Sequence, residues 1–250
     1  MTHDSTRIGL AGWSEAVSRS RGHFPQTTGT GLERYSSALN LVEVNVSFYR
    51  QVRRSTYESW AEQTPEDFAF SVKMSRAVTH FAKLSPQAPL DVFWESVAGL
   101  GDKLRAVLVQ LPPSLALDAS RASDFFARMR TSYDGLIAVE PRHESWRSEQ
   151  ARTICVQHQL TEVATAIPDA PSTPDTPPDP QTAYYRLHGE PRRYRSPYSL
   201  EQLERLATVL RQLTGPALVV FDNTATPAGV SNALALRELL EQDPESAPSD

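Results

Sequence analysis

The chain has 250 residues, of which 40% are hydrophobic and 22% charged, values typical of a soluble globular domain and unlike those of disordered or fibrous chains. Its formal net charge of −5 excludes an overall positive field, so neither nucleic acid nor an anionic membrane is an expected partner. The single cysteine, Cys155, cannot form an internal disulfide and is interpreted as a small buried hydrophobe. Because there is no signal-peptide-like start and no apolar run of about 18 residues, we expect a cytoplasmic protein.

Eight short β-rich runs alternate with longer amphipathic stretches along the chain. The predicted strands are Arg7 to Gly12, Leu41 to Ser47, Phe68 to Met74, Ala106 to Leu111, Leu136 to Glu140, Thr161 to Ile167, Ala183 to His188 and Ala217 to Asp222. The predicted helices are Leu32 to Leu39, Arg54 to Glu62, Leu90 to Leu100, Ser120 to Arg130, Ser148 to His158, Leu200 to Leu213 and Ala228 to Leu240. Alternation predicts a parallel sheet, and eight strands predict an α/β fold, the (β/α)8 barrel of TIM type.

One connection departs from this pattern. The segment PDAPSTPDTPPDPQ, from Pro168 to Gln181, contains too much proline for a helix, so we expect the regular sixth helix to be missing. The segment is either a lid over a pocket or a plain connector. Residues 1–242 are expected to form a single barrel domain, and residues 243–250 a disordered tail.

The alternation of side chains along each strand predicts which residues point into the barrel. From Val42 to Phe48 every second residue is apolar, which places Glu43 and Asn45 on the opposite, inner face. The same test predicts further inward residues on the other strands, namely Lys73, Gln110, Glu140, Tyr184, Arg186 and His188. Most of them lie near the carboxyl ends of their strands, where TIM barrels carry their sites.

Polar residues inside a barrel need partners, because an unpaired buried charge costs several kcal/mol. These side chains could pair among themselves and form an ion network that closes one end of the barrel. An ordinary barrel interior is Val, Ile and Leu, so we favour a polar, cation-rich pocket that binds a ligand.

At these residues the sequence resembles the YecE-like barrel proteins, known as domain of unknown function 72. The matching motifs are Ile8-Gly9, Gly12-Trp13, VEVNVSFYR from Val42, Trp60 with TPEDFAFSVKM, Thr79-His80, QLPPS from Gln110, VEPRHESW from Val139, YYRLHG from Tyr184, FDNT from Phe221, and Asn232-Ala233. They follow the family's order over nearly the whole chain. The resemblance implies a TIM-type barrel and no particular activity, with a pocket surrounded by Glu140, Arg142, His143, Arg186, His188 and Asn223.

The sequence departs from the family pattern at three places. Glu15 stands where a Tyr usually follows Gly-Trp-Ser, Val46 interrupts the usual Asn-Ser-Thr, and Asp222 replaces the first residue of the usual Asn-Asn. The change at Glu15 puts in doubt a role for the loop after the first strand.

Three residues are the candidates for catalysis: Glu140, His188 and Lys73. Glu140 ends its strand before Pro141 and could act as a general acid or base, or form a structural salt bridge. His188 can exchange a proton near neutral pH. Lys73 could be a base or a Schiff-base amine, although an anion-binding role is favoured because Arg142 and Arg186 are candidates for the same face.

The remaining candidates would bind substrate. His143 and His80 are loop residues that could also be hydrogen-bonding struts, whereas Gln110 and Asn223 would orient a ligand. The full set of predicted binding residues is Arg186, Arg142, His143, Gln110, Asn223, Asn45, Glu43, His80, Trp13 and Tyr184. A divalent metal held by Glu43, Glu140, His188 and Asp222 is the alternative, disfavoured because neighbouring Lys and Arg would repel a cation. No cofactor is predicted.

Two functions follow from this pocket. The first is a cofactor-independent acid/base enzyme, a hydrolase, lyase or isomerase, acting on a small anion that bears a phosphate or carboxylate. The second is a binding protein for a small anion or a nucleic-acid end, with no chemistry.

Overall fold

The computed structural model of the protein describes residues 6–14, 18, 20–24, 29–167 and 182–242. Its strands follow one another from β1 to β8 as a closed barrel, and the strand pairs β7–β8, β8–β1, β3–β4, β4–β5 and β5–β6 are parallel. The predicted α/β class, a (β/α)8 barrel of TIM type, is confirmed. The predicted gap at the sixth helix and the predicted tail fall on residues 168–181 and 243–250, outside the described residues.

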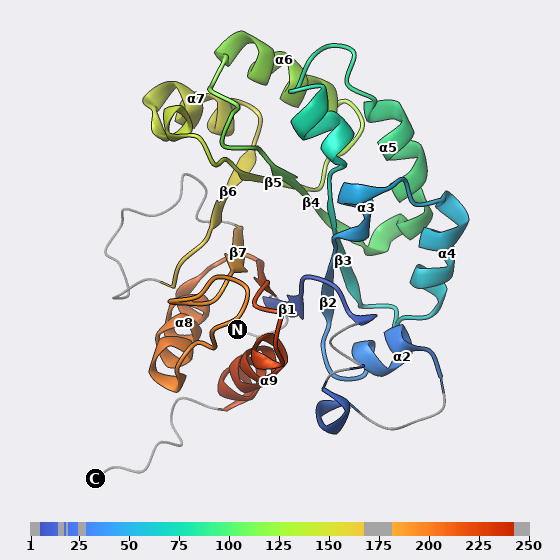
Figure 1. Cartoon of the computed structure of the whole chain (residues 1–250), viewed down its shortest axis with the longest axis vertical. Coiled ribbons are helices and arrows are strands. Elements are labelled where there is room, and N and C mark those ends of the chain that lie inside the picture. The colour runs from blue at the N-terminus through green and yellow to red at the C-terminus, as the bar shows by residue number, and fades with distance from the viewer. Residues whose placement is uncertain (1–5, 15–17, 19, 25–28, 168–181, 243–250) are drawn as a thin grey trace. The chain divides into compact units, whose positions relative to one another are not determined.

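Figure 1 traces the elements in chain order. The strands are β1 (Thr6–Leu10), β2 (Leu41–Val44), β3 (Ala69–Lys73), β4 (Leu104–Gln110), β5 (Leu136–Glu140), β6 (Leu160–Ala164), β7 (Ala183–Leu187) and β8 (Ala217–Phe221). The α-helices are α2 (Gly31–Ser36), α3 (Val46–Tyr49), α4 (Arg54–Glu62), α5 (Leu90–Val97), α6 (Ala119–Arg130), α7 (Glu149–Gln157), α8 (Leu200–Gln212) and α9 (Ala228–Glu241). Shorter turns of helix are η2 (Arg21–His23), η3 (Ala77–Phe81), η4 (Ala98–Lys103) and η5 (Glu144–Arg147). Among the described residues, no helix has both the length and the apolar character to cross a membrane.

Internal contacts divide the chain into two compact units, which are described one at a time. The first unit comprises Met1–Leu41, Ala164–Thr176 and Pro180–Asp250, and the second comprises Val42–Val163 and Pro177–Asp179. That residues 1–242 form a single domain therefore stays a prediction.

In the first unit, β8 lies between β7 and β1. All five residues of β8 are buried, as expected for a parallel strand that is covered on both faces and therefore reads as a continuous apolar run. Helices α8 and α9 pack side by side in the same unit, and their Leu206 and Leu236 are fully buried. A Ser199 capping box fixes the first turn of α8.

A buried tyrosine joins β1 to the chain at Leu41 in this unit. The Tyr35 hydroxyl accepts a hydrogen bond from the Leu10 backbone N–H at 2.8 Å and donates one to the Leu41 carbonyl at 2.7 Å. Gly9 permits this close approach, because a Cβ atom there would lie 1.8 Å from the Leu41 carbonyl oxygen. The close packing against Leu41 thus explains the glycine in the motif Ile8-Gly9.

Tyr35→Phe is expected to lower the free energy of unfolding by about 2–4 kcal/mol, since it leaves a buried N–H and a buried carbonyl without the hydroxyl. Chemical denaturation measures the change. Tyr49→Phe is the matched control. The Tyr49 side chain is 65% exposed, so loss of its hydroxyl should hardly change the free energy of unfolding. Equal stability of the Tyr35→Phe variant and the wild type would contradict this account.

The second unit is built on β3, β4, β5 and β6, which pair in that order. Helices α4 and α5 pack against η4, and α6 packs against α7. The core between strands and helices includes Phe70, Val107, Phe125 and Ile137, each no more than 1% exposed. Cys155 on α7 is buried, as the sequence predicts, and its burial raises the pKa of the thiol to about 11.

Two predicted strands extend three residues too far: β6 ends at Ala164 instead of Ile167, and β2 shows the same overrun. The sequence predicts a strand from Leu41 to Ser47, but β2 ends at Val44 and the chain turns into the short helix α3. Asn45 has helical backbone angles, and the Ser47 hydroxyl donates to the carbonyls of Val44 and Lys73 at 2.8 and 2.7 Å. This hydroxyl satisfies backbone oxygens at the strand end, so Asn45 and Ser47 do not share a strand face with Glu43.

Acid should destabilise the second unit through His158. Burial, and then the charge of Arg130, lower the pKa of His158 below its usual value of 6.5. The folded state therefore binds fewer protons than the unfolded state between 6.5 and that lower pKa, so stability falls as the pH falls through this window. The loss of stability is measured as the difference between the midpoints of chemical denaturation at about pH 7 and about pH 5. His158→Gln, which keeps a polar group for Ser123, should show a smaller loss, and an unchanged pH dependence would contradict the prediction.

Candidate functional site

In the first unit, the carboxyl ends of β7 and β8 lie beside each other. Leu187 pairs with Phe221, and the Asp222 N–H donates to the Leu187 carbonyl at 2.7 Å. The next residue after each strand, His188 and Asp222, is thereby brought to the same edge of the sheet. Arg186 precedes His188 by two residues and so shares its face of the strand.

These three residues form a buried polar cluster. One carboxylate oxygen, Asp222 Oδ2, accepts a hydrogen bond from His188 Nδ1 at 2.8 Å and lies 3.0 Å from Arg186 Nη1. The Arg186 and His188 residues are each 2% exposed, and Asp222 is 8% exposed. Because a carboxylate only accepts, His188 carries a proton on Nδ1, which makes Nε2 the basic nitrogen of the neutral ring.

The segment that follows His188 folds back over this cluster. Gly189 has a φ of +86°, and a Cβ atom on it would lie 2.4 Å from the Ser196 carbonyl oxygen, so only glycine fits without strain. The Gly189 N–H donates to the Tyr198 hydroxyl at 3.0 Å. The Tyr194 ring stands edge-on to the His188 ring, with centroids 5.5 Å apart. The chain therefore holds an aromatic side chain against the imidazole.

Two asparagines pin the same segment. Asn223 Nδ2 donates to the Ser196 carbonyl at 3.0 Å and to Asn232 Oδ1 at 3.1 Å, while Asn232 Nδ2 donates to the Tyr198 carbonyl at 2.9 Å. Asn223 is fully buried, and its Oδ1 atom has no hydrogen-bond partner among the described residues. The predicted substrate-orienting Asn223 thus holds a loop through its nitrogen.

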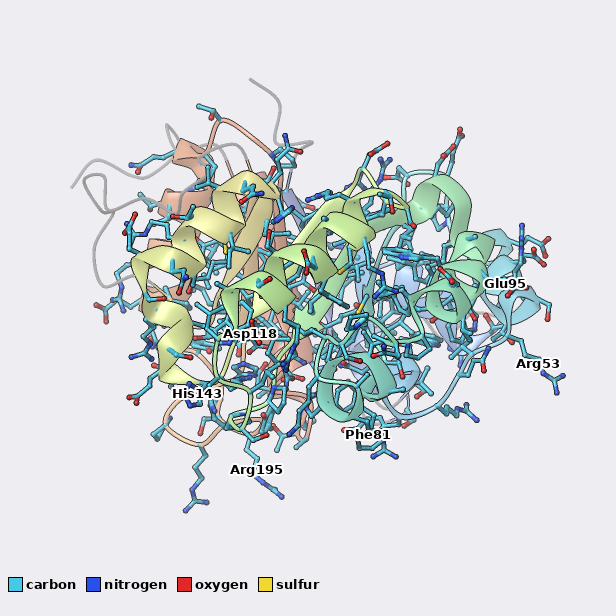
Figure 2. All side chains as sticks on the ribbon, turned by 90° about the horizontal axis from the view of Figure 1, so that it is seen from above. Arg53, Phe81, Glu95, Asp118, His143 and Arg195 are labelled. Atoms are coloured by element: carbon cyan, nitrogen blue, oxygen red, sulfur yellow. The ribbon has the colours of Figure 1, made fainter. Side chains whose placement is uncertain are left out.

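The pinned segment carries a basic run that the sequence analysis overlooked. Arg192, Arg193 and Arg195 are all exposed, and the Arg195 side chain extends away from the ribbon in Figure 2. The Arg195 carbonyl is held by the Thr226 hydroxyl at 2.8 Å, which fixes the backbone beneath the side chains. The sequence does carry a signal for this run: three arginines lie within four residues, shortly after the predicted strand that ends at His188.

In the second unit, a second group of predicted residues lies at the ends of three neighbouring strands. Lys73 pairs with Leu108, and Gln110 pairs with Glu140. Glu140 is 2% exposed and accepts a short hydrogen bond from the Arg142 guanidinium, which sits two residues further along the chain. This contact with Arg142 is a salt bridge of the kind that the sequence leaves open for Glu140.

Lys73 and His80 both contact Phe48. Lys73 Nζ lies 4.4 Å from the centre of the Phe48 ring, and the His80 ring stands edge-on to it with centroids 4.9 Å apart. His80 Nδ1 is hydrogen-bonded to the Thr79 hydroxyl at 2.8 Å. Burial, and then the charges of Lys73 and Arg76, lower the pKa of His80, so this ring is neutral at pH 7.

The structure also places the remaining predicted site residues, which are His143, Glu43, Asn45, Tyr184 and Trp13. His143 Nδ1 accepts from the Ser145 N–H at 3.2 Å and caps η5, which is the strut role that the sequence allows. Glu43 on β2 is fully buried, and the Oδ1 atom of the partly buried Asn45 has no hydrogen-bond partner among the described residues. Tyr184 is 1% exposed, and Trp13 is partly buried.

Two of the four candidate metal ligands, His188 and Asp222, contact each other. Asp222 contacts Arg186 and His188, and Glu140 contacts Arg142. Within the ranges that the structure describes, no group of three or more His, Cys, Asp or Glu side chains is placed to hold a metal ion.

Comparison with known proteins agrees with this architecture. The chain is 32% identical over 152 residues to the UPF0759 protein YunF of Bacillus subtilis, a match that covers 56% of this chain and 52% of that relative. A DUF72 family protein of Thermotoga maritima, TM1631, has 26% identity and a TM-score of 0.75, covering 95% of this chain and 99% of its own. A DUF72 family protein of Enterococcus faecalis, EF0366, has 22% identity and a TM-score of 0.76, covering 95% and 96%, and supports the fold alone. The model of the family described as "Protein of unknown function DUF72" matches residues 7–250, and the chain therefore belongs to this family.

Proposed function

We propose that this protein is an acid/base enzyme that acts on a small anionic substrate at the carboxyl ends of β7 and β8, without a redox cofactor. The observation that carries the proposal is the shared carboxylate oxygen of Asp222, which accepts from the ring of a buried histidine and lies against a buried guanidinium. A carboxylate on Nδ1 fixes the tautomer and orientation of an imidazole and makes Nε2 a better base. His188 is the proton-transfer group.

We infer an anionic substrate from Arg186 and from the arginines on the segment that follows His188. Arg186 lies within the cluster, and Arg192, Arg193 and Arg195 lie exposed on the segment that follows His188. Guanidinium groups bind carboxylates and phosphates through paired hydrogen bonds. In a chain with a net charge of −5, such a local concentration of arginines favours a bound anion.

The second unit has its own proton-transfer candidate. Glu140 is buried beside Arg142, and we propose it as a general acid or base, with Lys73 at the end of β3 as a further cation of the same unit. Among the predicted binding residues, Gln110 pairs with it at the strand ends. A cytoplasmic location is also a proposal, supported by a single buried cysteine.

A thermal-unfolding screen tests the anion-binding part. Sugar phosphates, 2-hydroxy and 2-keto carboxylates and nucleoside monophosphates are added singly, and at least one should raise the melting temperature, since a ligand that binds only the folded state stabilises it. Replacing Arg192, Arg193 and Arg195 together with Gln should weaken that ligand about tenfold. The matched control replaces three exposed arginines of the second unit with Gln: Arg121, Arg147 and Arg152. No stabilising compound, or an equal loss in the control, would refute the proposal.

A second function is favoured by one feature, the exposed run from Arg192 to Arg195 with Tyr194 inside it. Arginines alternating with an aromatic ring suit a nucleic-acid end, where phosphates pair and a base stacks. A labelled single-stranded DNA 12-mer would then bind with an affinity that falls steeply with salt. Weak binding with little salt dependence would leave the small-anion enzyme as the function.

A further inference from the structure

The second unit contains a pocket that the candidate site does not include. It has a volume of about 390 Å³ and lies between the chain that follows β2, the turn η3 and the helix α5. This volume falls within the range of about 300–1,000 Å³ that is usual for small-molecule sites. No residue predicted from the sequence as a site residue lines it.

The inner wall of the pocket is apolar, with a few hydroxyl groups. Val78, Phe93 and Val97 line it and are at most 7% exposed. Tyr57 and Ser47 also line it, each with a hydroxyl group. Burial raises the pKa of the Tyr57 phenol, which therefore stays a neutral donor. Such a wall suits an uncharged ring of a ligand. It offers few groups that could pair with a charged part of that ligand.

The mouth of the pocket is aromatic and cationic. The Arg76 guanidinium carbon lies 5.8 Å from the centre of the Tyr49 ring and 5.4 Å from that of the Phe81 ring. Tyr49 is 65% exposed and Phe81 is 70% exposed, and Phe81 projects at the surface of its unit in Figure 2. Two large aromatic side chains so exposed beside one pocket are a mark of a binding surface.

The backbone at the mouth is itself unusual. The turn η3 is a π-helix, closed by a hydrogen bond from the Ala82 N–H to the Ala77 carbonyl at 2.9 Å. A π-turn is rare and is found often at functional sites, because it re-aims the side chains it carries. It carries Phe81 and follows directly on Arg76. Among the described lining residues the charged ones are Arg50 and Arg76, so the mouth is positive.

We propose that this pocket binds a small planar aromatic molecule with one anionic group. The ring enters between the apolar wall and the exposed faces of Tyr49 and Phe81, and the carboxylate or sulfonate pairs with Arg76. A guanidinium that already stacks on aromatic rings is held in the plane that a bidentate anion needs. A purely aliphatic anion would contact the apolar wall but could not stack on the exposed rings of Tyr49 and Phe81.

The probe is 2-naphthoate, with binding followed by isothermal titration calorimetry and saturation-transfer NMR. The expected result is saturable binding of one molecule per chain. Neutral 2-naphthalenemethanol, which has the same ring system, should bind about tenfold more weakly, because it lacks the charge that pairs with Arg76. Cyclohexanecarboxylate, which keeps the charge and loses the flat ring, should also bind more weakly.

Two variants locate the bound probe. Arg76→Gln should weaken 2-naphthoate about tenfold, whereas Arg152→Gln, an exposed arginine on α7, should not. Val92→Trp places a large side chain at a lining position that is 45% exposed, and it should abolish binding without disturbing the core. Arg76 is exposed, so its variant keeps the test valid even if Val92→Trp folds poorly. No saturable binding up to the solubility limit, or wild-type affinity in Arg76→Gln, would overturn the proposal.

Discussion

Asp222→Ala is expected to lower the free energy of unfolding by about 3 kcal/mol, one of the larger losses available outside the apolar core. The substitution removes an oxygen that Arg186 and His188 share at 3.0 and 2.8 Å, in a cluster where both partners are 2% exposed. Loss of one member of a buried charged group is costly because the low-dielectric surroundings do not compensate for it. Urea denaturation measures the change.

Two variants make this prediction specific. Asp222→Asn keeps an accepting oxygen but not the charge, so it should cost less, about 1–2 kcal/mol. Asp124→Ala removes an exposed aspartate from α6 and should change stability by no more than about 0.5 kcal/mol. If Asp222→Ala unfolds at the same urea concentration as the wild type, the carboxylate is not the anchor of the cluster.

The second large effect concerns catalysis. His188→Asn is expected to lower turnover of the substrate by about 10²–10⁴-fold while leaving ligand affinity nearly unchanged, because proton transfer contributes a factor of this size. Asn is the informative replacement, since its amide N–H takes the place of Nδ1–H and can still donate to Asp222. It has no ionisable nitrogen in place of Nε2.

The control and the readout separate a catalytic from a structural role. His23→Asn changes an exposed histidine of the same unit and should leave turnover unchanged. The wild-type pH–rate profile should contain one ionisation that the His188→Asn profile lacks. A His188→Asn enzyme that keeps wild-type turnover, or that loses ligand affinity and stability together, would show that His188 is structural.

The barrel could be predicted from the sequence because its signals are local. The strand β5 and the helix α4 begin and end where the periodicity predicts, since buried parallel strands read as apolar runs and the exposed helix faces are polar. The strand β2 was predicted too long because the alternating valines from Val42 to Val46 also fit a strand that turns into a helix. One of the two Ser47 contacts at its end, with the Lys73 carbonyl, joins residues 26 positions apart.

Only some members of the candidate site, and none of their pairings, could be predicted from the sequence. Arg186 and His188 follow from the parity of one strand. The partner of His188 depends on the register of β7 against β8, which sets Asp222 beside it, and no local pattern encodes that register. Arg142 as a partner of Glu140 does not follow from strand parity, because it depends on how the chain after Pro141 brings that side chain back to the strand end.

The most direct test of the acid/base proposal is a conversion assay. Purified wild-type protein and the His188→Asn variant are incubated with the phosphates and carboxylates of the thermal screen, and proton and phosphorus NMR spectra are recorded before and after. The proposal predicts that at least one compound is converted by the wild type and that His188→Asn converts it at least about a hundredfold more slowly. Compounds that bind yet are recovered unchanged, or equal conversion by both proteins, would contradict the proposal.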